Sequence, residues 1–283
     1  SHGATTAVYA LARELDVAGT IDRHLGTSGR RDRRQPAHVA DPRRTPQRHD
    51  GLTVGRSLEL VCVGRTCHAT SKQGFAEWAR TTTLGDVARV DLEPLSSQHF
   101  WDQMEQVPIE VLAAIEREIV ARAIERFSLP LDTLLYDATN FFTFIASTNG
   151  RCELPARGRN KQKRHDLRQL GVALLCTRRD GIPLMHKMYG GQVPDARSFA
   201  EVLPLIRQRL VDLGRDLDSL TLVYDKGNVS ELNQGLVDQT KLHYVASLTA
   251  SSQRALITEA NPLLQSVKLD EEESVMAYRT RRT

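Results

Sequence analysis

Apolar residues recur every three or four positions in the first part of the chain, which is the pattern of amphipathic helices. Residues 4–25 show this spacing and predict one N-terminal helix. Residues 108–127 show it most clearly and begin with a proline, which favours the first turn of a helix. The apolar face of that helix should consist of Leu112, Ile115, Ile119 and Ile124. The first part is therefore expected to be all helical.

After Ser128 the pattern changes to short apolar runs bounded by Gly, Asp or Asn, which is typical of strands. Five strands are predicted, at 131–137, 169–177, 182–190, 219–225 and 243–247. Two helices lie between the later strands, at 196–213 and 230–240. The order is thus three strands, helix, strand, helix, strand. It matches the RNase H-like α/β fold, a mixed sheet in which the first and fourth strands are neighbours.

Five segments follow from these patterns. We expect an N-terminal helix at 1–25 and a basic, disordered linker at 26–50, where apolar periodicity is lost and arginines gather among Pro and Gly. A helical region should occupy 51–128. The incomplete RNase H-like core should span 129–261, and 262–283 should begin an inserted segment that is cut short.

Composition adds little to this picture. The chain has 283 residues, of which 40% are hydrophobic and 26% are charged, as in ordinary globular proteins. The formal net charge of +3 is only mildly basic, so binding of a polyanion depends on where the charges lie. No apolar stretch approaches the roughly 20 residues of a membrane span. We therefore expect a soluble protein that does not bind membranes.

Two aspartates stand out because each closes an apolar, strand-like run. Asp137 ends LDTLLYD and Asp225 ends LTLVYD, and a turn-forming Asn follows each. If the first and fourth strands are adjacent, these carboxylates meet at one edge of the sheet. Two such groups repel one another unless a cation lies between them. Their oxygen ligands suit Mg²⁺ or Mn²⁺, so both residues are predicted to bind a metal.

Four segments carry a resemblance to a known family. They are YDATNFF (136–142), GRNKQKRHDLRQLGVALL (158–175), GIPLMHKMYGGQVPDARSF (181–199) and LVYDKGNVS (222–230). These segments resemble the catalytic domain of bacterial insertion-sequence transposases, in the DDE group whose third acid lies in a Tyr-Arg-Glu-Lys signature. The likeness runs from about residue 51 to the C-terminus.

The resemblance implies a metal-dependent DNA transposase that cleaves phosphodiester bonds and transfers strands at the ends of an insertion sequence. It makes Asp137 and Asp225 the first two catalytic acids, which hold two Mg²⁺ or Mn²⁺ ions in the complete enzyme. It also implies double-stranded DNA as partner, a homodimer on that DNA and a bacterial cytoplasmic location. No Tyr-x2-Arg-x3-Glu-x6-Lys pattern occurs here, so the chain is expected to be truncated and inactive alone.

A basic stretch between the first two predicted strands is the candidate DNA contact. Residues 151–168 contain seven Lys or Arg against two acids, beside the predicted acidic site. Such side chains bind phosphates without reading bases. The DNA-binding candidates are Arg157, Arg159, Lys161, Lys163, Arg164, Arg168 and Lys226. Asn140 and Asn228 are candidates for orienting the two acids through hydrogen bonds.

Two other interpretations stay open from the sequence. One is an RNase H-like nuclease that hydrolyses nucleic acid without joining strands. The other is a remnant that binds DNA without catalysis, which the missing third acid favours. Products of strand transfer would separate the transposase from the nuclease.

Overall fold

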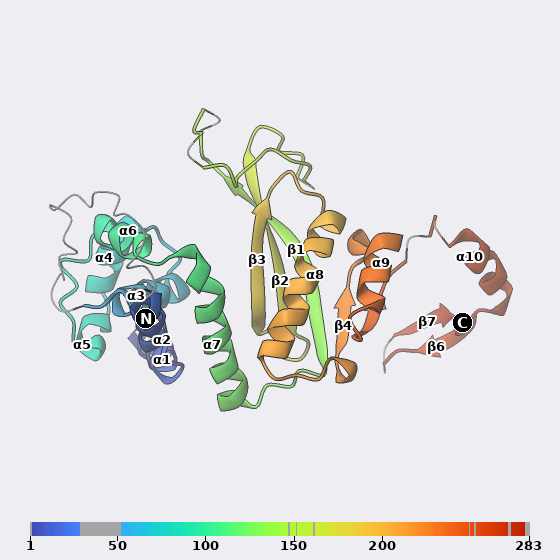
Figure 1. Cartoon of the computed structure of the whole chain (residues 1–283), viewed down its shortest axis with the longest axis horizontal. Helices are drawn as coiled ribbons and strands as arrows, with labels where there is room; N and C mark the ends of the chain where they lie inside the picture. The colour runs from blue at the N-terminus through green and yellow to red at the C-terminus, as the bar shows by residue number, and fades with distance from the viewer. Residues whose placement is uncertain are drawn as a thin grey trace. The chain divides into compact units, whose positions relative to one another are not determined.

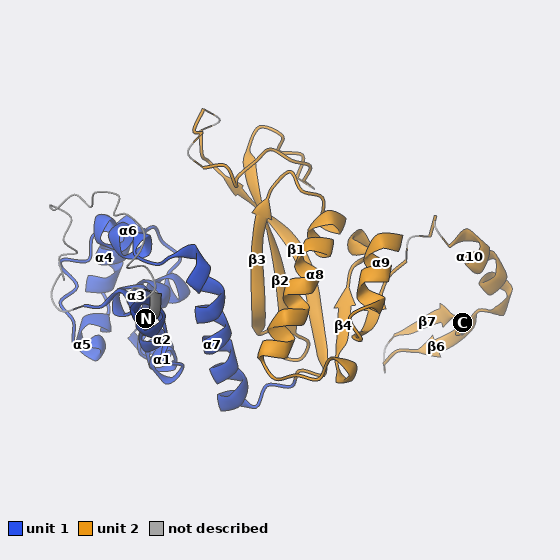
Figure 2. Cartoon of the chain, viewed as in Figure 1, with its two compact units in different colours: residues 1–130 blue, residues 131–283 orange. Residues whose placement is uncertain are grey.

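The computed structural model describes two compact units, which Figure 2 colours separately: residues 1–130 and residues 131–283. The described residues are 2–28, 52–146, 148–150, 152–160, 162–248, 250–251, 253–270 and 273–280. The predicted basic linker at 26–50 lies outside them beyond residue 28, and so does Lys161. Among the described helices, none has both the length and the apolar character to cross a membrane.

Unit 1 is helical, as the apolar spacing predicts (Figure 1). Its helices are α1 (His2–Glu14), α2 (Val17–Ser28), α3 (Val54–Cys67), α4 (Lys72–Arg80), α5 (Leu84–Ala88), α6 (Ser97–Glu105) and α7 (Ile109–Phe127). Phe75 and Phe100 pack edge to face at 4.9 Å between ring centroids and are fully buried. Such a contact stabilises the unit beyond the area that it buries.

The N-terminal segment differs from the single helix expected at 4–25. It forms two helices, because Asp16 adopts a left-handed conformation with φ 52°. Asp is one of the few residues that tolerate this conformation. Arg122 of α7 stabilises the break, since its guanidinium donates to the Leu15 carbonyl at 2.7 Å and lies 3.3 Å from the Asp16 carboxylate.

The buried face of α7 also differs from the expected one. Leu112 is 49% exposed, whereas Ile115, Val120 and Ile124 are buried. Leu112 lies in the first turn of the helix. The apolar spacing predicts the helix, but it does not predict how much of the helix is buried.

Unit 2 is built on a five-stranded sheet with the order β3-β2-β1-β4-β5. Its strands are β1 (Thr133–Thr143), β2 (Arg168–Thr177), β3 (Pro183–Gly190), β4 (Thr221–Tyr224) and β5 (His243–Ala246). β1, β2 and β3 are antiparallel neighbours, whereas β4 lies parallel to β1 and β5 parallel to β4. The first and fourth strands are therefore adjacent, and the RNase H-like expectation is confirmed.

One helix covers one face of this sheet. Helix α8 (Asp195–Asp212) follows β3 and directs Phe199 between Tyr136 of β1 and Tyr224 of β4. The ring centroids lie 5.0 and 4.8 Å apart. Figure 1 shows α8 running along the sheet, with α9 (Glu231–Asp238) between β4 and β5 in the chain. The aromatic cluster holds together the two strands that carry or immediately precede the aspartates.

The residues after β5 form small elements. These are α10 (Arg254–Ala260), the 3-10 turn Asn261–Leu263, and an antiparallel hairpin of β6 (Gln265–Lys268) and β7 (Ser274–Ala277). The segment 262–283, predicted to begin an insertion, contains this hairpin. Val267 and Met276 are exposed on it.

Candidate metal and nucleic-acid site

Asp137 and Asp225 occupy matching positions on neighbouring strands. The parallel register pairs Tyr136 with Tyr224, so the next residue along each strand is an aspartate. Asp225 keeps an extended backbone, with φ −76° and ψ 158°, and continues the line of β4 by one residue. Adjacent strands lie about 4.8 Å apart, so the two residues stand side by side despite their separation in sequence.

Both carboxylates are on the face of the sheet opposite α8. Side chains alternate along a strand, and Tyr136 and Tyr224 point into the buried cluster. Asp137 and Asp225, one position later, are exposed. The Oδ1 atom of each accepts a hydrogen bond from the next backbone N–H, at 2.8 Å from Ala138 and 2.6 Å from Lys226. Each aspartate is thereby held by its own backbone while it faces solvent.

Asn233 holds the turn that follows Asp225. Asp225 caps a 3-10 turn, Lys226–Asn228, and α9 begins directly after it. The buried Asn233 amide donates to the carbonyls of Asn228 at 2.7 Å and of Ala196 at 2.8 Å. One side chain therefore ties the turn to the first turn of α8. Sequence reasoning missed this residue, because a helix-borne Asn after Ser230 resembles an ordinary cap sequence.

The tyrosines behind the aspartates are not proton carriers at neutral pH. Burial raises the pKa of Tyr224 to about 12 and raises the pKa of Tyr136 further. A nearby Tyr189 on β3 also has its pKa raised, chiefly by burial. These phenols stay neutral, and their role in this region is packing.

The two asparagines predicted to orient the acids are placed differently. Asn140 lies three positions after Asp137 in β1, so its side chain stands on the opposite face. Asn228 is buried, and its backbone N–H donates to the Asp225 carbonyl at 3.0 Å. Asn228 is thus next to Asp225 through the turn itself, whereas the fold does not bring Asn140 beside the Asp137 carboxylate.

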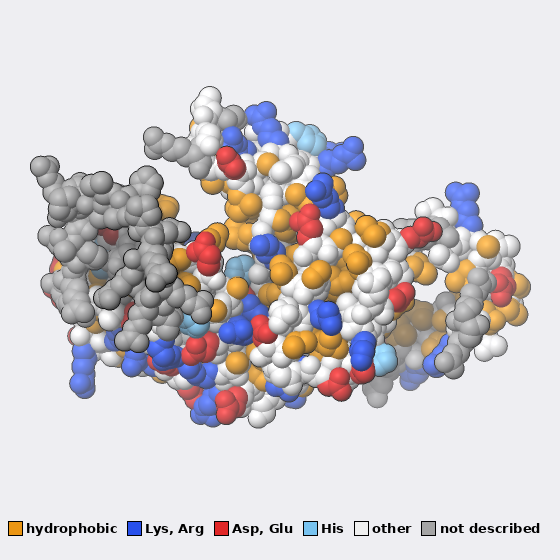
Figure 3. Space-filling model, viewed as in Figure 1, with side chains coloured by type: hydrophobic (Ala, Val, Ile, Leu, Met, Phe, Trp, Pro, Cys, Tyr) orange, Lys and Arg blue, Asp and Glu red, His pale blue; other side chains and the backbone are white. Residues whose placement is uncertain are grey.

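The basic segment between β1 and β2 projects from the end of the sheet (Figure 1), and we call residues 144–167 the β1–β2 arm. Arg157, Arg159 and Lys163 are exposed. Arg164 is exposed too, but it forms a two-point ion pair with Asp166 at 2.8 and 2.9 Å. Figure 3 shows basic side chains gathered over this arm.

The structure also describes Arg168 and Lys226, two of the remaining DNA-binding candidates. Arg168, at the start of β2, donates to the carbonyls of Asn149 and Cys152 at 2.9 and 3.4 Å and so holds the arm together. Lys226 is exposed directly after Asp225. The Arg164–Asp166 pair lowers the pKa of Asp166 to about 2, so that carboxylate offsets the charge of Arg164 at neutral pH. Arg159, Lys163 and Lys226 are accordingly better candidates for phosphate contact than Arg164.

Gln169 anchors the arm and was not found from the sequence. This buried residue of β2 donates its amide to the carbonyls of Gly191 at 2.8 Å and Arg159 at 3.1 Å. Its backbone also pairs with Ala156 through two hydrogen bonds of 2.9 and 3.0 Å. Gly158 makes this approach possible, because a Cβ there would lie 2.0 Å from the Gly191 carbonyl oxygen.

Within the described ranges, no group of three or more His, Cys, Asp or Glu side chains is placed to hold a metal ion. Among the described residues, no third acid therefore accompanies Asp137 and Asp225. Glu231 and Asp238 lie on α9 and Glu259 on α10, and none of them joins the pair. Two carboxylates still fit Mg²⁺, which commonly takes one or two protein carboxylates and completes its shell with water and phosphate.

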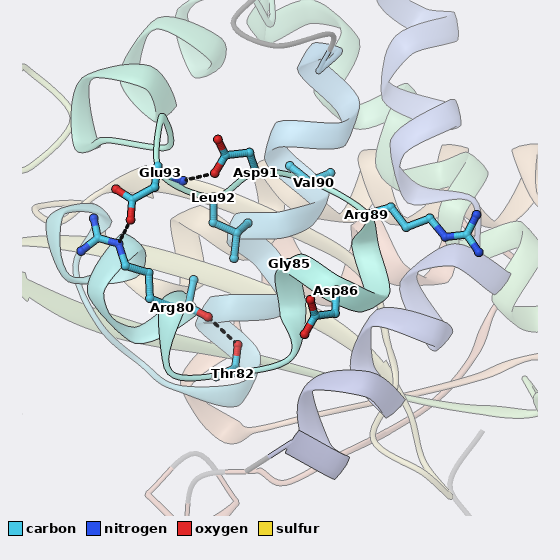
Figure 4. A pocket seen from close by; sticks show the side chains of 10 residues that line it. Arg80, Thr82, Gly85, Asp86, Arg89, Val90, Asp91, Leu92 and Glu93 are labelled. Atoms are coloured by element: carbon cyan, nitrogen blue, oxygen red, sulfur yellow. Dashed lines mark hydrogen bonds and ion pairs between the residues drawn. The ribbon is translucent and has the colours of Figure 1, made fainter.

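A separate groove lies in unit 1 and has a volume of about 570 Å³ (Figure 4). An ion pair of 3.0 Å joins Arg80 and Glu93 at its rim, and Asp91 accepts from the Glu93 backbone at 3.0 Å. Asp86 and Arg89 also line it. Three acids against two arginines make the groove unsuited to a phosphate.

Comparisons with known proteins find distant likenesses only. No family model matches the chain, and no curated protein matches it. Among solved structures it is similar to a Mos1 transposase paired-end complex with the left transposon end, at 11% identity over 84% of this chain and 71% of that chain, with a TM-score of 0.29.

A second solved structure is a piggyBac transposase synaptic complex with hairpin DNA, at 12% identity and a TM-score of 0.38. The match covers 87% of this chain but only 52% of the piggyBac chain, about half its length. A Mos1 mariner paired-end complex with Mn is similar at 10% identity over 85% of this chain and 72% of that chain, with a TM-score of 0.27. These TM-scores are low, so a functional argument has to rest on the residues of this chain.

Proposed function

We propose that this chain is the catalytic region of a DNA transposase of the DDE type, resembling the insertion-sequence group with the Tyr-Arg-Glu-Lys signature. The observation that carries the proposal is the register of β1 and β4, which sets Asp137 beside Asp225 on an open face of the sheet. The sequence segments around both aspartates independently resemble that family.

In the proposed site, Asp137 and Asp225 hold Mg²⁺ or Mn²⁺ through their carboxylate oxygens. Ions held by Asp137 and Asp225 would supply Lewis-acid chemistry, namely activation of a water or a 3′ hydroxyl and stabilisation of the leaving oxygen of a phosphodiester. The protein positions the carboxylates on the open face of a rigid sheet, which keeps them in place without reorganisation when DNA binds. The exposed face leaves room for the DNA strand.

Phosphate binding falls to the β1–β2 arm and the turn after β4. Arg159 and Lys163 project from the arm, and Lys226 follows Asp225 directly. Side chains of this kind fix the position of a duplex through its backbone and carry no sequence information. We further propose a homodimer on double-stranded DNA in the bacterial cytoplasm, as in the family that the sequence resembles.

Binding of Mn²⁺, followed by electron paramagnetic resonance of the free ion, tests the metal site without requiring DNA cleavage. Asp137→Asn and Asp225→Asn should each weaken Mn²⁺ binding at least tenfold, because each removes a charged ligand. Asp132→Asn is the matched control, since Asp132 is exposed just before β1, five positions before Asp137. Equal Mn²⁺ affinity in all three variants would refute the site.

A second function, DNA binding without catalysis, is favoured by one observation. The described residues contain no third acid near the aspartate pair. On this interpretation the chain binds duplex DNA and Mn²⁺ but leaves the DNA intact. Cleavage of end-containing DNA by the purified chain, lost in Asp137→Asn, would rule it out. Cleavage without joined products would instead favour a nuclease.

A further inference from the structure

Strand β1 continues well past the proposed metal site. It begins at Thr133, reaches Asp137 after four residues and ends six residues later at Thr143. β2 pairs with β1 over this whole extension, as far as Thr143 opposite Arg168. The extension is therefore a hydrogen-bonded ribbon that carries its side chains on a rigid backbone.

Two aromatic side chains of this extension are exposed. Phe141 is 58% exposed within β1, and Phe144 is 88% exposed directly after the strand. Phe141 is four residues beyond Asp137, so both side chains are on the same face of the sheet. At about 3.3 Å per residue, the ring of Phe141 stands roughly 13 Å from Asp137 along the strand.

The described basic residues follow these rings in the chain, from Arg157 onward. The β1–β2 arm begins at Phe144 and carries exposed Arg157, Arg159 and Lys163. Gln169 and the Ala156 bridge hold the arm against the ends of β2 and β3, so its position is defined. Exposed aromatic rings at the start of a cationic arm are the kind of surface that binds unpaired bases, because a ring stacks on the base while cations hold the phosphates.

We infer that Phe141 and Phe144 each offer a ring on which unpaired bases stack, beyond the phosphodiester at Asp137 and Asp225, and we call these two rings the platform. This inference rests on the proposed function and adds to it a preference for DNA with unpaired bases. The platform favours DNA whose strands are separated beside the cleavage point over fully paired DNA. Stacking on one ring contributes enough for a roughly 5- to 150-fold preference.

Fluorescence anisotropy of labelled DNA tests the platform, with a fully paired duplex and the same duplex carrying an unpaired tract. Phe141→Ala and Phe144→Ala should each weaken binding of the unpaired tract by roughly 5- to 150-fold and change binding of the paired duplex less than twofold. Phe144→Trp should retain the preference. Phe127→Ala is the matched control, because Phe127 is 45% exposed at the end of α7 in unit 1.

The outcomes separate this inference from the proposed function. If the chain binds both DNAs equally and the alanine variants change neither, the platform is refuted while DNA binding stands. If neither DNA binds, the proposed function fails with it. If the alanine variants instead abolish self-association in sedimentation velocity and leave the DNA preference unchanged, the rings belong to an interface between copies and the inference is overturned.

Discussion

The two aspartates are held in different ways. Asp137 lies inside β1 and is paired with Leu174 of β2, so the sheet holds its backbone through β2. Asp225 follows the last residue of β4 and begins a turn. That turn depends on Asn233, whose amide joins the Asn228 and Ala196 carbonyls. The second aspartate is therefore the more sensitive to changes outside the strand.

This difference predicts the effect of Asn233→Ala. Removing the amide takes this donor from the buried Asn228 carbonyl and the partly buried Ala196 carbonyl, and it loosens the turn that positions Asp225. We expect Mn²⁺ affinity to fall by roughly 10- to 100-fold, as for other groups that orient metal ligands. Isothermal titration calorimetry measures it, with Gln234→Ala on the same helix as control. Unchanged Mn²⁺ affinity in Asn233→Ala would show that the turn does not depend on this amide.

The raised pKa of Tyr224 predicts that the protein loses stability at alkaline pH. Its pKa is raised to about 12 in the folded protein from an ordinary value near 10, so the folded state holds the proton more tightly than the unfolded state. The stability that this group contributes is fully present below about pH 10. It is lost as the pH rises to about 12, which lowers the free energy of unfolding by up to about 2–3 kcal/mol.

Urea unfolding at several pH values between 8 and 12 measures this loss. Tyr224→Phe has no proton to lose at this position, so its free energy of unfolding should fall less steeply above pH 10 than that of the unchanged protein. Tyr278→Phe, at a partly exposed position near the C-terminus, is the control and should follow the unchanged protein. Parallel curves for Tyr224→Phe and the unchanged protein would contradict the assignment.

At the scale of elements, the sheet was predictable and the arm was not. Short apolar runs bounded by turn residues gave all five strands of the main sheet in their correct order, because burial imposes that pattern. β1 runs to Thr143 instead of ending at Asp137, since its outer half is paired but exposed. A strand that is paired but exposed shows no apolar pattern in the sequence. The hydrogen bonds that Gln169 donates show no such pattern either.

The arm predicts a salt effect on DNA binding. Arg159→Gln together with Lys163→Gln should weaken binding on every sequence and flatten the slope of log affinity against log salt by about 0.9 for each phosphate that is no longer neutralised. Arg179→Gln, in the turn between β2 and β3, is a matched control at the other end of the sheet. A slope that does not change would remove the arm from the DNA interface.

At the scale of the whole molecule, the chain separates a helical unit from the unit that carries the candidate site. The change of hydrophobic period after Ser128 predicted this division of structure types, since helices and strands bury side chains with different periods. The break at Asp16 could not be predicted in this way, because it depends on Arg122 of α7, which lies far away in the sequence.

The central claim is that Asp137 and Asp225 share bound metal on the open face of the sheet. Anomalous scattering from crystals of the chain grown with Mn²⁺ tests it most directly. The account predicts a Mn²⁺ peak within about 2.0–2.3 Å of a carboxylate oxygen of each aspartate, since small divalent ions bind oxygen at such distances. A Mn²⁺ peak that touches only one of the two carboxylates, or none near either, would contradict it.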